Sequence, residues 1–158
     1  MRKRIITPVQ PTTAMPDLQW LNVEQLATVE ITSEDAAHPI ESALRLPGQV
    51  SGWRAATPGV QTIRLLFDQP QRLQRIWLNF VETQAERTQE YVLRWSPDGG
   101  KSFQEIVRQQ WNFNPNGATS ETEDHQVALA AVTVLELSII PDISKGKALA
   151  ALAQLRLA

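Results

Sequence analysis

The amino-acid sequence predicts an all-β fold, an antiparallel β-sandwich of about eight or nine short strands with short helical turns. The clearest sign is residues 90–108 (EYVLRWSPDGGKSFQEIVR), which predict two strands joined by a tight turn. Tyr91, Leu93 and Trp95 occupy alternate positions, so they give the first strand an apolar face. The turn at residues 97–100 contains Asp-Gly-Gly, which supplies the positive φ angles of a hairpin. Similar apolar runs recur along the chain at regular spacing, with turn residues between them.

The first third of the chain is expected to contain one strand and little other regular structure. Residues 1–17 are rich in proline and threonine, and they should form a loose N-terminal arm. A short helical turn is expected within residues 16–26, and the alternation of ATVEIT predicts a strand over residues 27–32. A further helical turn fits residues 40–46, in a segment broken by proline and glycine.

The segment before the central hairpin predicts a pair of strands. The apolar runs of residues 60–67 and 73–81 are separated by the turn residues 68–71 (DQPQ). Residues 82–89 (ETQAERTQ) are polar and are expected to form the loop that leads into the hairpin.

The last third of the chain predicts three more strands. Residues 125–129 and 132–140 are two of them, separated by Ala130 and Ala131. The second run is nearly continuous in Val, Leu and Ile, as expected for a strand buried on both faces. Residues 148–157 predict a final strand, with a helical turn before it as the competing interpretation because alanine and leucine favour helices.

Length and composition indicate one domain, over residues 18–158, and exclude several classes of function. The chain has 158 residues and a net charge of -2, so no general attraction to nucleic acid or to anionic membranes is expected. It contains no cysteine, which excludes disulfides, thiolate zinc sites and cysteine nucleophiles. No apolar run follows the basic start, so we expect no signal peptide, no membrane span and a cytoplasmic protein.

The sequence does not predict an enzyme or a metal site. It has no Gly-x-Ser-x-Gly, phosphate-binding loop or dinucleotide fingerprint. Glu121, Glu123 and Asp124 are candidate paired carboxylates for glycoside hydrolysis, but no acid–base partner accompanies them. His38 and His125 are far apart in the sequence, which argues against a two-histidine metal site.

The order of these motifs resembles the discoidin domain family, also called the coagulation-factor C-type or galactose-binding-like family. The matching features before the hairpin are Trp53 after an irregular loop, a strand ending in Asp68, and the apolar strand around Ile76-Trp77-Leu78. The hairpin matches the family at Tyr91, Leu93, Ser96, Asp98, Gly99 and Phe103.

This resemblance implies a jelly-roll sandwich whose family members bind sugars, phospholipid surfaces, proteins or broken DNA. Many members close the domain with a disulfide, which this chain cannot form. Many also hold structural calcium through an Ala-x-Asp-Gly loop. The matching residues 42–45 are Ser-Ala-Leu-Arg and lack that Asp, so we expect no calcium and no other cofactor.

The long loops are expected to share one end of the sandwich. Antiparallel neighbours joined by short turns alternate ends, which brings residues 52–59, 82–89, 110–124 and 141–146 together. Trp111 or Phe113 is the candidate apolar platform for a sugar ring, with hydrogen bonds from polar side chains around it. The candidate ligand-binding residues are Trp53, Arg54, Glu82, Arg87, Trp111, Asn112, Phe113 and Glu121.

The aromatic residues in these loops have an alternative role. Trp53, Trp111 and Phe113 can fold inward as loop anchors, with Arg87 and Glu90 in a structural ion pair. We expect Trp111 to be partly buried with one exposed edge, and Phe113 to be the more exposed contact.

The sequence therefore predicts a non-catalytic ligand-binding module, with carbohydrate as the expected ligand. The alternative is an intracellular protein–protein interaction domain, favoured by the missing signal peptide, the absent cysteines and the weak calcium motif.

Overall fold

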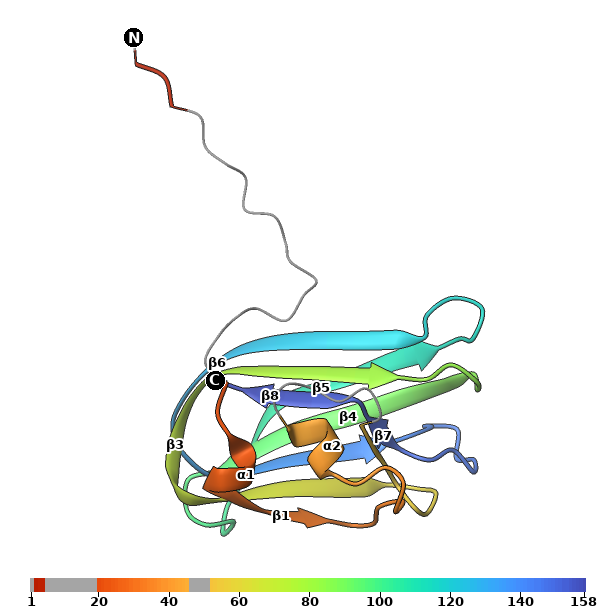
Figure 1. Ribbon diagram of the computed structural model, residues 1–158, viewed down its shortest axis with the longest axis horizontal. Coiled ribbons are helices and arrows are strands. Elements are labelled where there is room, and N and C mark those ends of the chain that lie inside the picture. Colours follow the sequence, from red (N-terminus) through yellow and green to blue (C-terminus); the bar gives the residue numbers. More distant parts are fainter. Residues whose placement is uncertain (1, 5–19, 46–51) are drawn as a thin grey trace.

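Two long strands, β3 (Gln61–Val81) and β6 (Ser120–Ile140), organise the fold in the computed structural model, which describes residues 2–4, 20–45 and 52–158. They pair antiparallel from one end to the other, with register shifts between Leu66 and Arg75. In Figure 1 both strands bend at the left edge and pass from one layer of the molecule to the other. The predicted antiparallel sandwich is confirmed, and the two layers share these strands.

The bend corrects the prediction of separate strands joined by tight turns at residues 68–71 and at Ala130-Ala131. Both segments lie within continuous strands. No ladder pair with β6 falls between Leu66 and Gln71, and Pro70 has no N–H to donate. The ladder is therefore interrupted where it turns the corner, while the backbone stays extended.

The central hairpin is confirmed and is longer than predicted. β4 (Arg87–Ser96) pairs with β5 (Gln104–Phe113), and the turn between them has Gly99 and Gly100 at φ 74° and 95°. Hydrogen bonds from Ser102 and Ser96 to the turn carboxylate lower the pKa of Asp98 to about 2.

The remaining elements complete a six-stranded sheet, which bends through both layers, and a separate two-stranded sheet. The larger sheet has the order β1-β3-β6-β4-β5, and β8 (Gln154–Leu157) pairs with the second half of β3. The smaller sheet joins β2 (Trp53–Arg54) to β7 (Ala151–Leu152). The predicted first strand is β1 (Ala27–Ile31), and the predicted helical turns are α1 (Val23–Leu26) and α2 (Glu41–Leu44). Among the described helices, none is long and apolar enough to cross a membrane.

The core lies between the two layers and follows from the period-2 alternation of the strands. Inward positions of β3, β4 and β6 are almost fully buried, whereas their neighbours in the sequence are more exposed. Representative core residues are Ile63, Leu65, Leu78, Phe80, Tyr91, Leu93, Leu137 and Ile139.

The loops gather at the right-hand end of Figure 1, as the alternation of strands predicts. Hydrogen bonds join them: the Glu82 N–H donates to the Thr119 carbonyl at 2.9 Å, and the Ile143 N–H donates to the Thr88 carbonyl at 2.9 Å. The predicted loop over residues 110–124 is shorter than expected, because β5 extends to Phe113 and β6 begins at Ser120.

The two ends of the domain meet at the opposite side of the sandwich. The Leu21 N–H donates to the Leu157 carbonyl at 2.8 Å, and the Gln74 N–H donates to the Ala158 carbonyl at 2.7 Å. The C-terminus lies at the left in Figure 1. Apart from residues 2–4, the arm predicted over residues 1–17 lies outside the described residues.

Candidate functional site

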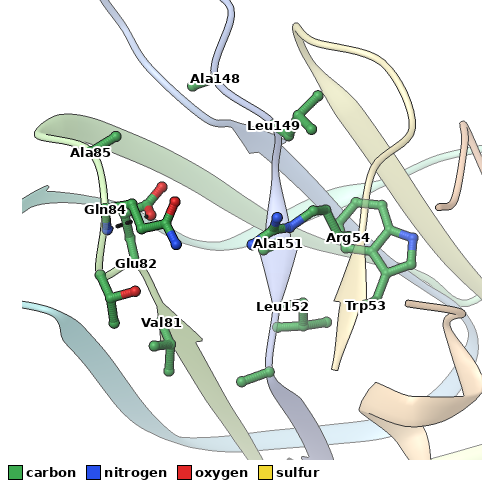
Figure 2. Close-up of a pocket in the computed structure, with 12 residues that line it drawn as sticks. Trp53, Arg54, Val81, Glu82, Gln84, Ala85, Ala148, Leu149, Ala151 and Leu152 are labelled. Atoms are coloured by element: carbon green, nitrogen blue, oxygen red, sulfur yellow. Dashed lines mark hydrogen bonds between the residues drawn. The ribbon is translucent and has the colours of Figure 1, made fainter. Parts of the chain in front are cut away.

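A hollow of about 410 Å³ opens at the loop end of the sandwich. Its walls are β2, the end of β3 with the loop that follows it, and the segment around β7 (Figure 2). Trp53, Arg54 and Glu82 line it, so three of the residues predicted from the sequence come together here. Some of the loops that strand direction brings together therefore line a hollow.

Arg54 supplies the exposed positive charge of this hollow. Figure 2 shows its side chain passing Ala151 and pointing towards Gln84 on the opposite wall. Within the described part of the chain, its guanidinium makes no hydrogen bond or ion pair. The Gln84 N–H donates to the Glu82 carboxylate at 3.2 Å, which fixes the facing loop. The guanidinium, the amide and the carboxylate are all planar polar groups suited to hydroxyl recognition.

Trp53 builds the floor of the hollow and does not offer a platform. It is 1% exposed, and its indole N–H donates to the Ser33 carbonyl at 3.1 Å. Gly52 precedes it at φ +62°, where a Cβ atom would lie 2.6 Å from the Leu152 carbonyl oxygen. Only glycine therefore allows β2 to approach β7 this closely. The inward anchoring considered for Trp53 is confirmed.

Arg87 holds the loops together from below the surface. Its guanidinium donates to the Glu82 carboxylate at 2.8 Å and to the Pro141 carbonyl at 2.7 Å, and it lies 4.9 Å from the Phe113 ring centre. Burial opposes the charge of Glu82, but hydrogen bonds from Arg87 and the backbone lower the pKa of this carboxyl. The predicted pair with Glu90 is wrong, because Arg87 pairs with Glu82, whereas Glu90 pairs with Arg108 at 3.4 Å.

The candidate platform residues do not line the hollow. Phe113 is 0% exposed, so its prediction as the exposed contact is wrong. The error arises because the strand continues through this residue and points it into the core. Trp111 is partly buried, as predicted, and packs against the core on the same face of β5. Asn112 is exposed on the other face, where it accepts a hydrogen bond from Thr88 at 3.2 Å.

Glu121 lies inside the sandwich, outside the hollow. It accepts a hydrogen bond from the Gln89 side chain at 3.4 Å, and its second carboxylate oxygen has no partner among the described residues. Burial, followed by the neighbouring Glu123, raises the pKa of the Glu121 carboxyl to about 8. This residue therefore holds a proton near neutral pH and is not placed to contact a ligand in the hollow.

Part of the site was not found from the sequence. The missed wall consists of small and aliphatic residues: Ala148, Leu149, Ala151, Leu152 and Ala153. The sequence predicts the start of a closing strand here. It does not reveal that these residues approach β2, which is distant in the chain. The available signal was Gly52 directly before Trp53, because a glycine there marks a close backbone approach.

The loop that resembles a calcium site does not fit calcium. Residues 42–45 form the end of α2 and the residue after it, and buried Leu44 stands where the family motif has Asp. Calcium requires several oxygen ligands, usually including carboxylates. Here the carbonyls of Ala43 and Arg45 accept hydrogen bonds from Arg156. In residues 2–4, 20–45 and 52–158, no group of three His, Cys, Asp or Glu side chains is placed to hold a metal.

Comparison with known proteins identifies structural neighbours but no relative in sequence. No protein-family model and no curated protein matches the chain. A family 32 carbohydrate-binding module from C. perfringens NanJ, solved in complex with galactose, has 14% identity and a TM-score of 0.65, covering 87% of this chain and 96% of the module. A second Clostridium perfringens module, solved with GalNAc-β-1,3-galactose, has 17% identity and a TM-score of 0.62, covering 88% and 99%.

A third neighbour was solved in a protein complex. The structure of reduced XRCC1 bound to the DNA polymerase β catalytic domain has 12% identity and a TM-score of 0.61, covering 84% of this chain and 95% of that chain. At these identities the likeness establishes the fold. The galactose-binding-like sandwich implied by the sequence resemblance is confirmed.

Proposed function

We propose that this domain is a non-catalytic carbohydrate-binding module whose ligand occupies the hollow at the loop end. The observation that carries this proposal is the guanidinium of Arg54, which has no partner among the described residues and faces the amide of Gln84 across the hollow. The volume of about 410 Å³ is in the range of small-molecule sites. Structural neighbours solved with galactose and with GalNAc-β-1,3-galactose support a sugar ligand.

The hollow supplies both kinds of contact that a sugar requires. Arg54, Glu82 and Gln84 provide directional hydrogen bonds for hydroxyl groups. Val81 and Leu149 provide an aliphatic surface for the ring, in place of the aromatic platform predicted from the sequence. Because no aromatic ring face is offered by the described lining residues, we expect the affinity to depend mainly on the polar contacts.

The same geometry argues for binding without catalysis. Glycoside hydrolysis ordinarily uses two carboxyl groups on either side of the scissile bond. Glu82 is the one carboxylate among the described lining residues, and it is already paired with Arg87. Glu121, whose pKa is raised, lies outside the hollow.

An intracellular protein-interaction domain is the second candidate. Val60, Val81 and Ile143 are exposed large apolar residues next to the loops of the site end. The neighbour solved as a complex with a polymerase domain supports this use of the fold. The cytoplasmic location predicted from the sequence is proposed together with this second function.

A glycan array with matched variants tests the first proposal. Arg54→Ala and Gln84→Ala should each weaken binding of any glycan retained by the unmodified protein, Arg54→Ala by about tenfold or more. Arg108→Ala is the control, because this arginine lies on β5 outside the hollow with 53% of its side chain exposed. Its binding and melting temperature should match those of the unmodified protein.

Two results would contradict the proposal. Glycan binding that survives both substitutions would place the ligand outside the hollow. If no glycan is retained, and a partner protein binds in a manner that depends on Val81 and Ile143, the interaction-domain proposal is favoured.

A further inference from the structure

A buried arginine joins the last strand to the segment after α2. Arg156 of β8 is 1% exposed. One terminal nitrogen, Nη1, donates to the carbonyls of Ala43 and Leu155 at 2.8 and 2.9 Å. The other, Nη2, donates to the Arg45 carbonyl at 2.7 Å. The guanidinium thus bridges segments that are more than a hundred positions apart in the sequence.

No negative charge compensates this guanidinium within residues 2–4, 20–45 and 52–158. Each of its hydrogen bonds goes to a backbone carbonyl, and Nε has no partner among these residues. Burial lowers the pKa of Arg156, although arginine remains charged in proteins. Carbonyl oxygens that converge on a buried positive charge are typical of a cation-binding site. Here the positive charge is on a side chain of the protein itself.

The atoms available as metal ligands explain why a metal ion does not fit at the end of α2. Leu44 brings an apolar side chain to the position where the resembling family has Asp. The carbonyls that remain, of Ala43 and Arg45, are already engaged by Arg156. A calcium ion there would lack carboxylate ligands and would lie next to a positive charge.

We propose that the guanidinium of Arg156 is a built-in substitute for a structural metal ion in this domain. It crosslinks the end of α2 to β8 through backbone carbonyls, as a bound cation would. Stability then becomes independent of metal concentration, because a side chain of the protein itself holds the end of α2 against β8. The proposal does not depend on what the hollow binds.

Chelation is the first test, and it uses the unmodified protein. The melting temperature should change by less than about 1 °C on adding EDTA, and equally little on adding millimolar calcium, since no ion stabilises the native state by mass action. A fall of several degrees in EDTA, restored by calcium, would overturn the proposal. Because this measurement needs no variant, it tests the proposal even if the Arg156 variants fail to fold.

Substitution of Arg156 is the second test. Arg156→Met should lower the melting temperature by roughly 5–10 °C, because the carbonyls lose charge-assisted donors in a buried place. Arg156→Lys should recover only part of this loss, since a compact ammonium does not span the separated carbonyls. Arg108→Met, at an exposed arginine, is the control and should stay within about 2 °C of the unmodified protein. An Arg156→Met variant as stable as this control would overturn the proposal.

Arg156→Glu tests whether the carbonyls that Arg156 contacts can also bind a metal cation. The carboxylate adds the missing kind of ligand to the carbonyls of Ala43 and Arg45. The variant should be destabilised in EDTA and should gain several degrees of melting temperature in millimolar calcium, unlike the unmodified protein. If calcium does not change the melting temperature of this variant, the carbonyls do not form a cation-binding site.

Discussion

At the scale of single residues, Glu121 shows how the fold changes the chemistry that a side chain has in the sequence. In the sequence it stands in a polar run with Glu123 and Asp124, which suggests a solvated loop. In the structure it is the inward residue of an extended strand, and its carboxyl group is buried. Burial and the adjacent Glu123 raise its pKa to about 8.

This shift predicts a defined pH dependence of stability. The carboxyl has an ordinary pKa of 4.5 when unfolded and about 8 when folded, so its contribution is fully present below about 4.5. The contribution is lost as pH rises towards and through 8, because deprotonation leaves a buried charge. Glu121→Gln removes this penalty. The variant should melt several degrees above the unmodified protein at pH 8.5 and close to it at pH 4.

Thermal melts followed by circular dichroism between pH 4 and 9 measure this difference. Glu105→Gln is the control, since 49% of that side chain is exposed and its substitution should not change the pH dependence. A difference between Glu121→Gln and the unmodified protein that stays constant across the pH range would show that Glu121 does not titrate as described.

At the scale of elements, the sequence predicts the hairpin and the core strands correctly but misplaces their ends. Alternation identifies Tyr91 and Leu93 as core because every second position must face the same layer. It does not reveal where a strand stops when polar side chains face solvent. The sequence predicts a loop over residues 110–113 because of their polar neighbours, but these residues pair with β4 and the ladder continues through them.

Arg87 of β4 links two loops at the loop end, and this gives a prediction. Arg87→Met removes the ion pair with Glu82 and the hydrogen bond to the Pro141 carbonyl. Breaking a buried pair should lower the free energy of unfolding by roughly 3–5 kcal/mol. The Glu82 loop also loses its anchor, so glycan affinity should fall although Arg87 itself is buried.

Urea denaturation and glycan binding, measured on the same samples, test this prediction. Arg87→Lys should restore part of the stability, because it keeps the charge but not the several donors of the guanidinium. An Arg87→Met variant with unchanged stability would show that the loops are held by the backbone contacts alone.

At the scale of the whole molecule, β3 and β6 make the two layers one cooperative unit. Each strand contributes residues to both layers, so neither layer can unfold while the other keeps its full ladder. The fold class was predictable because strand spacing and alternation are local properties of the sequence. The wall of the hollow at Ala148–Ala153 was not, because it depends on how Gly52 and Leu152 meet across the fold.

A single unfolding transition is therefore expected. Far-ultraviolet circular dichroism reports the strands, and fluorescence of the five tryptophans reports the packing around them. Both should give the same melting temperature, and the calorimetric and van't Hoff enthalpies should agree. Two resolved transitions would mean that the layers unfold separately despite the shared strands.

The hydrogen bond between Leu21 and Leu157 has a consequence for fusion proteins. The chain enters and leaves the sandwich at neighbouring points, on the side away from the loops (Figure 1). A protein attached before residue 21 or after residue 158 starts from that side and leaves the hollow open to solvent. The same geometry allows the whole domain to be spliced into a surface loop of a host protein, because its two attachment points need only a narrow gap.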